Sequence, residues 1–141
     1  MNQFKVDWVL INKLAIGPVP RKEAHIEVLK KMNISSIFSL CSEEEFSSSI
    51  NLKDFFYCQK LVLPDHKVGK NPTNEEIKKA LSILKKTMRN GPTFIHCVAA
   101  MERSPLICLA WLIKEEKFTL QQSLDYLMQV HPGTNPLDSQ L

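Results

Sequence analysis

The chain has 141 residues, of which 44% are hydrophobic and 23% are charged, and its formal net charge is +3. This length supports one domain with a substantial core and is too short for two. The composition is that of an ordinary globular protein, which excludes disordered and fibrous classes. We therefore expect a single domain over residues 1–141.

Targeting signals and paired cysteines are both missing from the sequence. The N-terminus has no basic region followed by a long apolar stretch, and no apolar run approaches the roughly 20 residues that span a bilayer. The four cysteines show no CxxC spacing, which argues for free thiols and against a zinc site. These features predict a soluble, cytoplasmic protein that is not bound to a membrane.

Strands and one helix are predicted in the first half of the chain. Residues 6–11 and 13–17 have the pattern of two short strands, and residues 34–40 and 55–63 have that of two more. Between them, residues 21–32 predict an amphipathic helix, because apolar residues recur there at helical spacing: Ala24, Val28, Leu29 and Met32.

Helices dominate the second half. Capping-box patterns at Thr73 and Thr119 begin two helices, one ending before Gly91 and one near Val130. Residues 93–97 form a wholly apolar strand, typical of the centre of a sheet, and residues 104–116 form a further helix. This alternation predicts an α/β domain with a central mixed, mostly parallel sheet of about four to five strands flanked by helices.

The densest group of basic residues lies on the helix that begins at Thr73. Its periodicity indicates a solvated helix face rather than a nucleic-acid-binding patch. The group comprises Lys78, Lys79, Lys85, Lys86 and Arg89. We expect no nucleic-acid partner.

The segment FIHCVAAMERSP, residues 94–105, places Cys97 between a predicted strand and a predicted helix. The loop between them must be tight, and its inward N–H groups together with the helix dipole would bind an anion. The same groups and Arg103 would favour the thiolate of Cys97, a nucleophile suited to attack phosphorus. Arg103 would bind two phosphate oxygens, and Ser104 could donate a hydrogen bond to the sulfur.

Chance also produces a cysteine and an arginine six residues apart, and a buried cysteine is commonly a small core residue. We interpret Cys58 and Cys108 in that way. Cys97 differs because a strand precedes it and a helix follows it. His96 would lie beneath the loop and orient its backbone, and we do not expect it to act as a catalytic base.

Displacement of an alkoxide or phenoxide also requires a general acid. Asp65 follows a predicted strand, and the carboxyl ends of parallel strands meet at one edge of a sheet. We therefore expect Asp65 to lie near Cys97, with His66 as a weaker rival for the role.

The sequence His96-Cys97, five residues, Arg103-Ser104 resembles the HCxxxxxR(S/T) signature of cysteine-dependent protein phosphatases, in particular the compact dual-specificity branch. The similarity extends to residues 13–41, to the LPD of residues 63–65 and to residues 118–141. It implies Cys97 as nucleophile, Arg103 as phosphate ligand, Asp65 as general acid and Ser104 as thiolate partner. It further implies a phosphocysteine intermediate with no metal or other cofactor, and phosphate binding by the loop amides of Val98, Ala99, Ala100, Met101, Glu102 and Arg103.

Two residues depart from the family pattern. Ala100 stands where the family usually has glycine, which costs about 1 kcal/mol if that position requires a positive φ. Glu102 is a carboxylate next to Arg103, and it either orients that arginine or opposes phosphate. Residues 98–102 contain no lysine or arginine, so we expect no basic rim and no preference for polyphosphorylated substrates.

Cys41 ends a strand predicted to neighbour that of Cys97. Some relatives place a cysteine there that forms a reversible disulfide with the nucleophile, so Cys41 is a possible redox partner, with a core cysteine as the alternative.

The sequence thus predicts a monomeric phosphatase of phosphotyrosine, with possible activity on phosphoserine and phosphothreonine, acting on phosphoproteins or phosphopeptides. Three alternatives remain open. They are a phosphate-binding pseudophosphatase, a phosphatase of lipid or inositol phosphates or of RNA 5′-triphosphates, and a thiol redox or sulfur-transfer protein.

Overall fold

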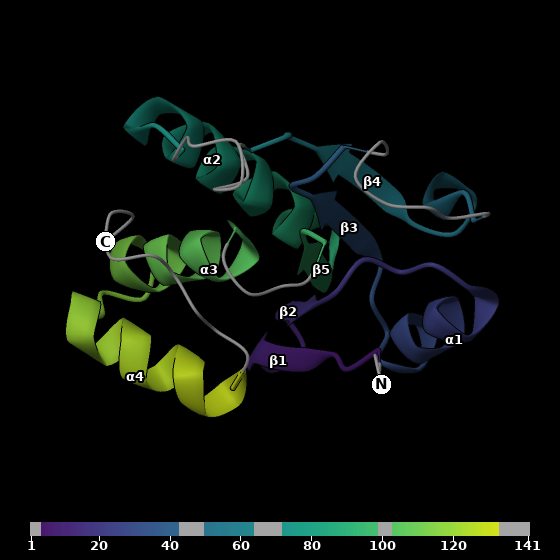
Figure 1. Ribbon diagram of the computed structural model, residues 1–141, viewed down its shortest axis with the longest axis horizontal. Helices are drawn as coiled ribbons and strands as arrows, with labels where there is room; N and C mark the ends of the chain where they lie inside the picture. Colours follow the sequence, from purple (N-terminus) through teal and green to yellow (C-terminus); the bar gives the residue numbers. More distant parts are fainter. Residues whose placement is uncertain (1–3, 43–49, 64–71, 99–102, 133–141) are drawn as a thin grey trace.

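A computed structural model describes residues 4–42, 50–63, 72–98 and 103–132 of the chain (Figure 1). In chain order the elements are β1 (Asp7–Leu10), β2 (Leu14–Gly17), α1 (Glu23–Lys31), β3 (Ser36–Ser39), η2 (Leu52–Asp54), β4 (Tyr57–Lys60), α2 (Asn74–Asn90), β5 (Thr93–His96), α3 (Arg103–Lys114) and α4 (Leu120–Val130). Each helix and strand predicted above occurs, with ends that differ by a few residues.

The strands form one five-stranded sheet in the order β1-β2-β5-β3-β4. β1 runs antiparallel to β2, while β5 is parallel to both of its neighbours and β4 is parallel to β3. All four residues of β5 are buried, as expected for an apolar strand with a neighbour on each side. The predicted mixed, mostly parallel sheet is confirmed.

Helices cover both faces of the sheet, because alternate strand residues point to opposite sides. Ile16, Phe38 and Ile95 belong to a core shared with α2, α3 and α4. Ala15, Ile37 and Phe94 belong to a second core shared with α1. Figure 1 shows α1 on one side of the sheet and the other three helices on the opposite side. Nine of the twelve residues of α3 are buried, since α2, α4 and β5 all pack against it.

The buried face of α1 differs from the predicted one. Ala24 and Val28 are exposed, whereas Ile26 and Leu29 are buried. Ile26 and Leu29 are three residues apart and therefore share one helix face, and Val28 lies about 100° around the helix from Leu29. Prediction of the helix and of Leu29 in its buried stripe was correct, but Ala24 and Val28 were wrongly assigned to the stripe and Ile26 was missed.

Both predicted capping boxes are present. The hydroxyls of Thr73 and Thr119 accept from the backbone N–H groups three residues later, and the side chains of Glu76 and Gln122 accept from the two capping residues in return. These bonds satisfy N–H groups that have no partner inside the helix. They set the first residues of α2 and α4.

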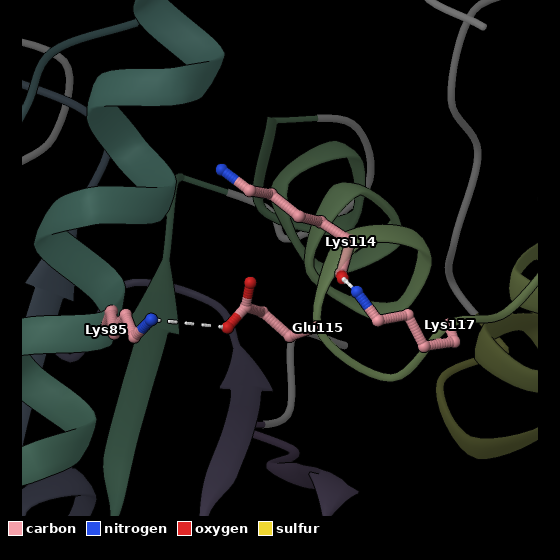
Figure 2. Close-up of polar contacts among 4 residues, drawn as sticks. All are labelled: Lys85, Lys114, Glu115 and Lys117. Carbon is pink, nitrogen blue, oxygen red and sulfur yellow. Dashed lines mark hydrogen bonds and ion pairs between the residues drawn. The ribbon is translucent and has the colours of Figure 1, made fainter.

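The basic residues of α2 lie on its solvated side, as predicted. Figure 2 shows the far end of this face, where Lys85 Nζ lies 3.7 Å from Glu115 Oε1 just after α3. In the same view Lys117 Nζ donates to the carbonyl oxygen of Lys114 at 2.9 Å and so caps the end of α3. The ion pair therefore connects α2 to the end of α3. Within the described ranges, no helix is both long and apolar enough to cross a membrane.

Candidate active site

Cys97 is the first residue after β5, the central strand. Gly17 of β2 and Ser39 of β3 both pair in register with His96, so three parallel strands end side by side at this point. The carboxyl edge of parallel strands is where α/β proteins commonly bind ligands. Cys97 is 3% exposed, so it is buried where these strands end.

His96 is fully buried and bonded through both ring nitrogens. Nδ1 lies 2.9 Å from the carbonyl oxygen of Cys97, and Nε2 lies 2.6 Å from the hydroxyl oxygen of Ser39. A carbonyl oxygen can only accept, so Nδ1 carries the proton and Nε2 accepts from Ser39. His96 therefore ties the backbone of Cys97 to the neighbouring strand, which is the orienting position that the sequence predicted.

The protonation state of His96 follows from its burial. The pKa of His96 is lowered from 6.5 to about 4, mainly by burial and to a smaller extent by the positive charges of Lys60 and Arg103, while the bond to the Cys97 carbonyl acts in the opposite direction. The imidazole is therefore neutral near pH 7 and keeps the tautomer that the Cys97 carbonyl requires.

Arg103 is the first residue of α3 and is 4% exposed. Its Nη1 donates to the carbonyl oxygen of Leu63 at 3.3 Å. Leu63 is itself held at the edge, because its N–H donates to the carbonyl oxygen of Leu40 just after β3. The guanidinium thus contacts the connection that follows β4.

Ser104 is fully buried in the first turn of α3. Its hydroxyl has no hydrogen-bond partner in the part of the chain that the structure describes, the sulfur of Cys97 included. A buried hydroxyl without a partner costs about 1–3 kcal/mol. Its predicted bond to the thiolate stays a prediction, and the unsatisfied hydroxyl is the kind of group that such a bond would satisfy.

The predicted general acid lies outside the described residues, as do His66 and the loop residues Ala99, Ala100, Met101 and Glu102. The nearest described residue before Asp65 is Leu63, which is buried and contacts Arg103. The chain therefore enters the segment containing Asp65 from the carboxyl edge of the sheet, next to Arg103.

The remaining cysteines occupy different surroundings. Cys41 is buried, with its sulfur 3.9 Å from Nδ1 of His96, so it lies beneath the residue that precedes Cys97. Cys108 is a core residue, as predicted, and its thiol pKa is raised by burial and then by negative charge on Cys97. Cys58 is only partly buried, and its burial also raises its pKa.

One part of the edge was not anticipated from the sequence. The N–H of Val19 donates to the carbonyl oxygen of Val98 at 3.2 Å, which fixes the segment between β2 and α1 against the start of the Cys97 loop. This contact brings the exposed Arg21 and Lys22 to the same edge. The expectation of no basic rim considered only residues 98–102, although a parallel β-α-β unit places the start of its helix at this edge.

Among the residues for which coordinates are described, no three His, Cys, Asp or Glu side chains lie close enough together to hold a metal ion.

Cys97 and Arg103 thus stand at either end of one loop in an α/β domain. The model of the family "Dual specificity phosphatase, catalytic domain" matches residues 19–141, and the chain belongs to this family. The predicted superfamily and branch are confirmed.

Individual relatives are more distant. Dual specificity protein phosphatase 5 of Homo sapiens is 38% identical over 48 residues, which are 34% of this chain and 12% of that protein. The phosphatidylglycerophosphate phosphatase PTPMT2 of Arabidopsis thaliana is 26% identical over 128 residues, which are 89% of this chain and 55% of that protein. The chain thus spans from about an eighth to just over half of the length of these relatives.

Solved structures share the fold. The crystal structure of Tk-PTP in the active form is similar with a TM-score of 0.81 and 20% sequence identity, covering 96% of this chain and 90% of that one.

The buried His96 predicts a specific dependence of stability on pH. Its lowered pKa means that the unfolded state binds a proton between pH 6.5 and about 4 that the folded state does not bind. The free energy of unfolding should therefore fall as the pH falls through this window, by about 2 kcal/mol between pH 7 and pH 5 from this group. Urea denaturation at the two pH values measures it.

His96→Asn is the matched comparison, because it retains a polar side chain that does not titrate. The wild type should lose about 2 kcal/mol more than this variant between pH 7 and pH 5. His25, whose pKa is also lowered, is present in both proteins and cancels from the difference. Equal losses in the two proteins would show that His96 is not held neutral in the fold.

Proposed function

We propose that this chain hydrolyses phosphomonoesters through a phosphocysteine intermediate on Cys97. The observation that carries the proposal is the placement of Cys97 and Arg103 at the two ends of one loop, between the central strand and the buried helix α3. Membership of the dual-specificity phosphatase family supports it.

The proposed reaction has two steps. The thiolate of Cys97 attacks phosphorus, so an S–P bond forms while the P–O bond to the leaving group breaks, and Asp65 protonates the leaving oxygen. Water then attacks the phosphocysteine, Asp65 accepts its proton, and the S–P bond breaks to release phosphate. Arg103 and the loop N–H groups bind the phosphoryl oxygens in both steps. Ser104 donates a hydrogen bond to the sulfur when it leaves.

Protein phosphotyrosine is the proposed substrate, with phosphoserine and phosphothreonine as further substrates. A domain of 141 residues has few segments that could form the sides of a deep binding pocket. We therefore expect a shallow pocket that accepts several kinds of phosphorylated side chain. We further propose that the protein acts as a cytoplasmic monomer.

Lipid or inositol phosphates are the second candidate substrates. The observation that favours them is the similarity to the Arabidopsis phosphatidylglycerophosphate phosphatase, which extends over 89% of this chain. A panel of phosphopeptides and of lipid and inositol phosphates, assayed by phosphate release at equal concentration, separates the two classes.

Turnover of para-nitrophenyl phosphate between pH 5 and pH 8, with EDTA and reductant present, tests the chemistry directly. Cys97→Ser should abolish it, because a serine hydroxyl is not ionised at these pH values and no thiolate remains to attack phosphorus. Asp65→Asn should lower kcat by about 100-fold, the usual contribution of a general acid. The matched control Cys58→Ser removes a thiol far from the edge and should retain activity.

Each other outcome has a defined meaning. Turnover that survives Cys97→Ser would contradict a cysteine nucleophile. Unchanged turnover in Asp65→Asn, with loss in Cys97→Ser, would favour a thiol redox or sulfur-transfer protein over a phosphatase. An inactive wild type that still binds vanadate would make the chain a phosphate-binding pseudophosphatase, with Ala100 and Glu102 as the residues to revert.

We also propose that Cys41 is the resolving thiol of an oxidised Cys97. Peroxide would oxidise the Cys97 thiolate to a sulfenic acid, and the Cys41 thiol would then displace hydroxide to form a disulfide. The two cysteines follow adjacent strands, and Cys41 contacts His96.

Mild peroxide treatment and mass spectrometry of non-reduced peptides should reveal a Cys41–Cys97 link whose reduction restores activity. Cys41→Ser should prevent the link, whereas Cys58→Ser should leave it intact. The absence of a linked peptide in the wild type would contradict the role.

A further inference from the structure

Two exposed basic residues lie at the edge that holds Cys97, on a segment held in place by two contacts. Gly17, at the end of β2, pairs with His96. Two residues later the N–H of Val19 donates to the carbonyl oxygen of Val98. Arg21 follows Val19 by two residues, so their Cα atoms are at most about 7 Å apart. Arg21 and Lys22 are therefore close neighbours of the Cys97 loop.

The start of α1 is anchored rather than loose. The N–H of Arg21 donates to Nδ1 of His25 at 2.9 Å, and the ring of His25 stacks on Phe4 with centroids 4.1 Å apart. Phe4 in turn lies 6.0 Å from Phe94 of the central strand. Burial, followed by the charges of Lys22 and Arg21, lowers the pKa of His25, which keeps Nδ1 available as an acceptor.

Among the described residues, the start of α1 gains nothing from positive charge here. Lys22 occupies the N-cap of α1 without a side-chain bond to the helix, whereas α2 and α4 begin with threonine capping boxes. A lysine at this position is a poor cap and is repelled by the positive end of the helix dipole. Its only acidic neighbour in the first turn of α1 is Glu23.

We propose that Arg21 and Lys22 determine specificity by binding a second phosphate-type anion on the substrate, a few bonds from the phosphomonoester cleaved at Cys97. The inference rests on the proposed function, because it concerns the rim of the same site. An arginine and a lysine side by side supply one forked and one compact cation, which suits the several oxygens of a phosphate or phosphodiester group. Favoured substrates are small diol or polyol phosphates with two such groups.

Three substrates with a common propyl backbone test this directly. They are 3-hydroxypropyl phosphate, propane-1,3-diyl bisphosphate and 3-phosphooxypropanoate, whose second groups are a hydroxyl, a phosphate and a carboxylate. The bisphosphate has two cleavable groups, which alone doubles kcat/KM. We expect a preference for it over the monophosphate of about tenfold beyond this factor, as two partly exposed charge contacts would give.

The double substitution Arg21→Gln and Lys22→Gln should reduce that ratio to the statistical factor of about two. Lys31→Gln is the matched control, because it removes one charge from the opposite end of the same helix. The control should keep the preference of the wild type. Added salt should weaken the preference, since these charges are exposed.

The outcomes separate this inference from the proposed function. A wild-type ratio near two, or a ratio that survives the double substitution, would overturn the subsite and leave phosphatase chemistry intact. An equal gain with the carboxylate substrate would show that the subsite does not select phosphate over carboxylate. It would favour acidic phosphopeptides as the substrates.

If the wild type shows no turnover that depends on Cys97, the proposed function fails. The subsite is then tested by measuring ligand binding instead of turnover. Isothermal titration of the Cys97→Ser protein with the bisphosphate and the monophosphate should show the same tenfold preference, lost in the double variant. Equal binding of the two compounds would overturn it.

Discussion

The hydrogen bonds of one buried histidine hold the site together. His96 donates to the carbonyl oxygen of Cys97 and accepts from Ser39, so the chain leaves the central strand in one fixed direction. Because the ring is buried and neutral near pH 7, this bonding pattern does not change with small changes in pH. A preorganised backbone is what a cradle of N–H groups needs if it is to bind phosphate without rearrangement.

The parallel sheet accounts for what gathers around that histidine. β2, β3 and β5 end in register, and the segments that follow them carry Val19, Cys41 and Cys97 to one edge. The connection after β4 adds Leu63, whose carbonyl oxygen receives the hydrogen bond of Arg103. Residues from four separate segments thus meet at this edge. The two cores, one on each face of the sheet, stabilise the fold that holds them there.

Much of this arrangement could be predicted from the sequence, and the failures have physical causes. Capping residues and apolar strands are local signals, so the elements, the sheet class and the position of Cys97 followed directly. The buried stripe of α1 was misassigned because Ile26 and Val28 are equally apolar, and only packing against the sheet distinguishes them. The basic rim was missed because Arg21 lies far from Cys97 in sequence, and the Val19–Val98 bond that joins them leaves no local pattern. The sequence singled out the hydroxyl of Ser104 as a candidate site group, but its lack of a hydrogen-bond partner among the described residues is visible only in the fold.

The central claim is that Cys97 becomes covalently phosphorylated during turnover. The most direct measurement is a rapid acid quench of the Asp65→Asn variant during turnover of para-nitrophenyl phosphate, followed by mass spectrometry of its peptides. One phosphoryl group is expected on the peptide that contains Cys97, and none when Cys97→Ser is combined with the variant. Phosphate on another residue, or sustained turnover with no phosphorylated peptide, would contradict it.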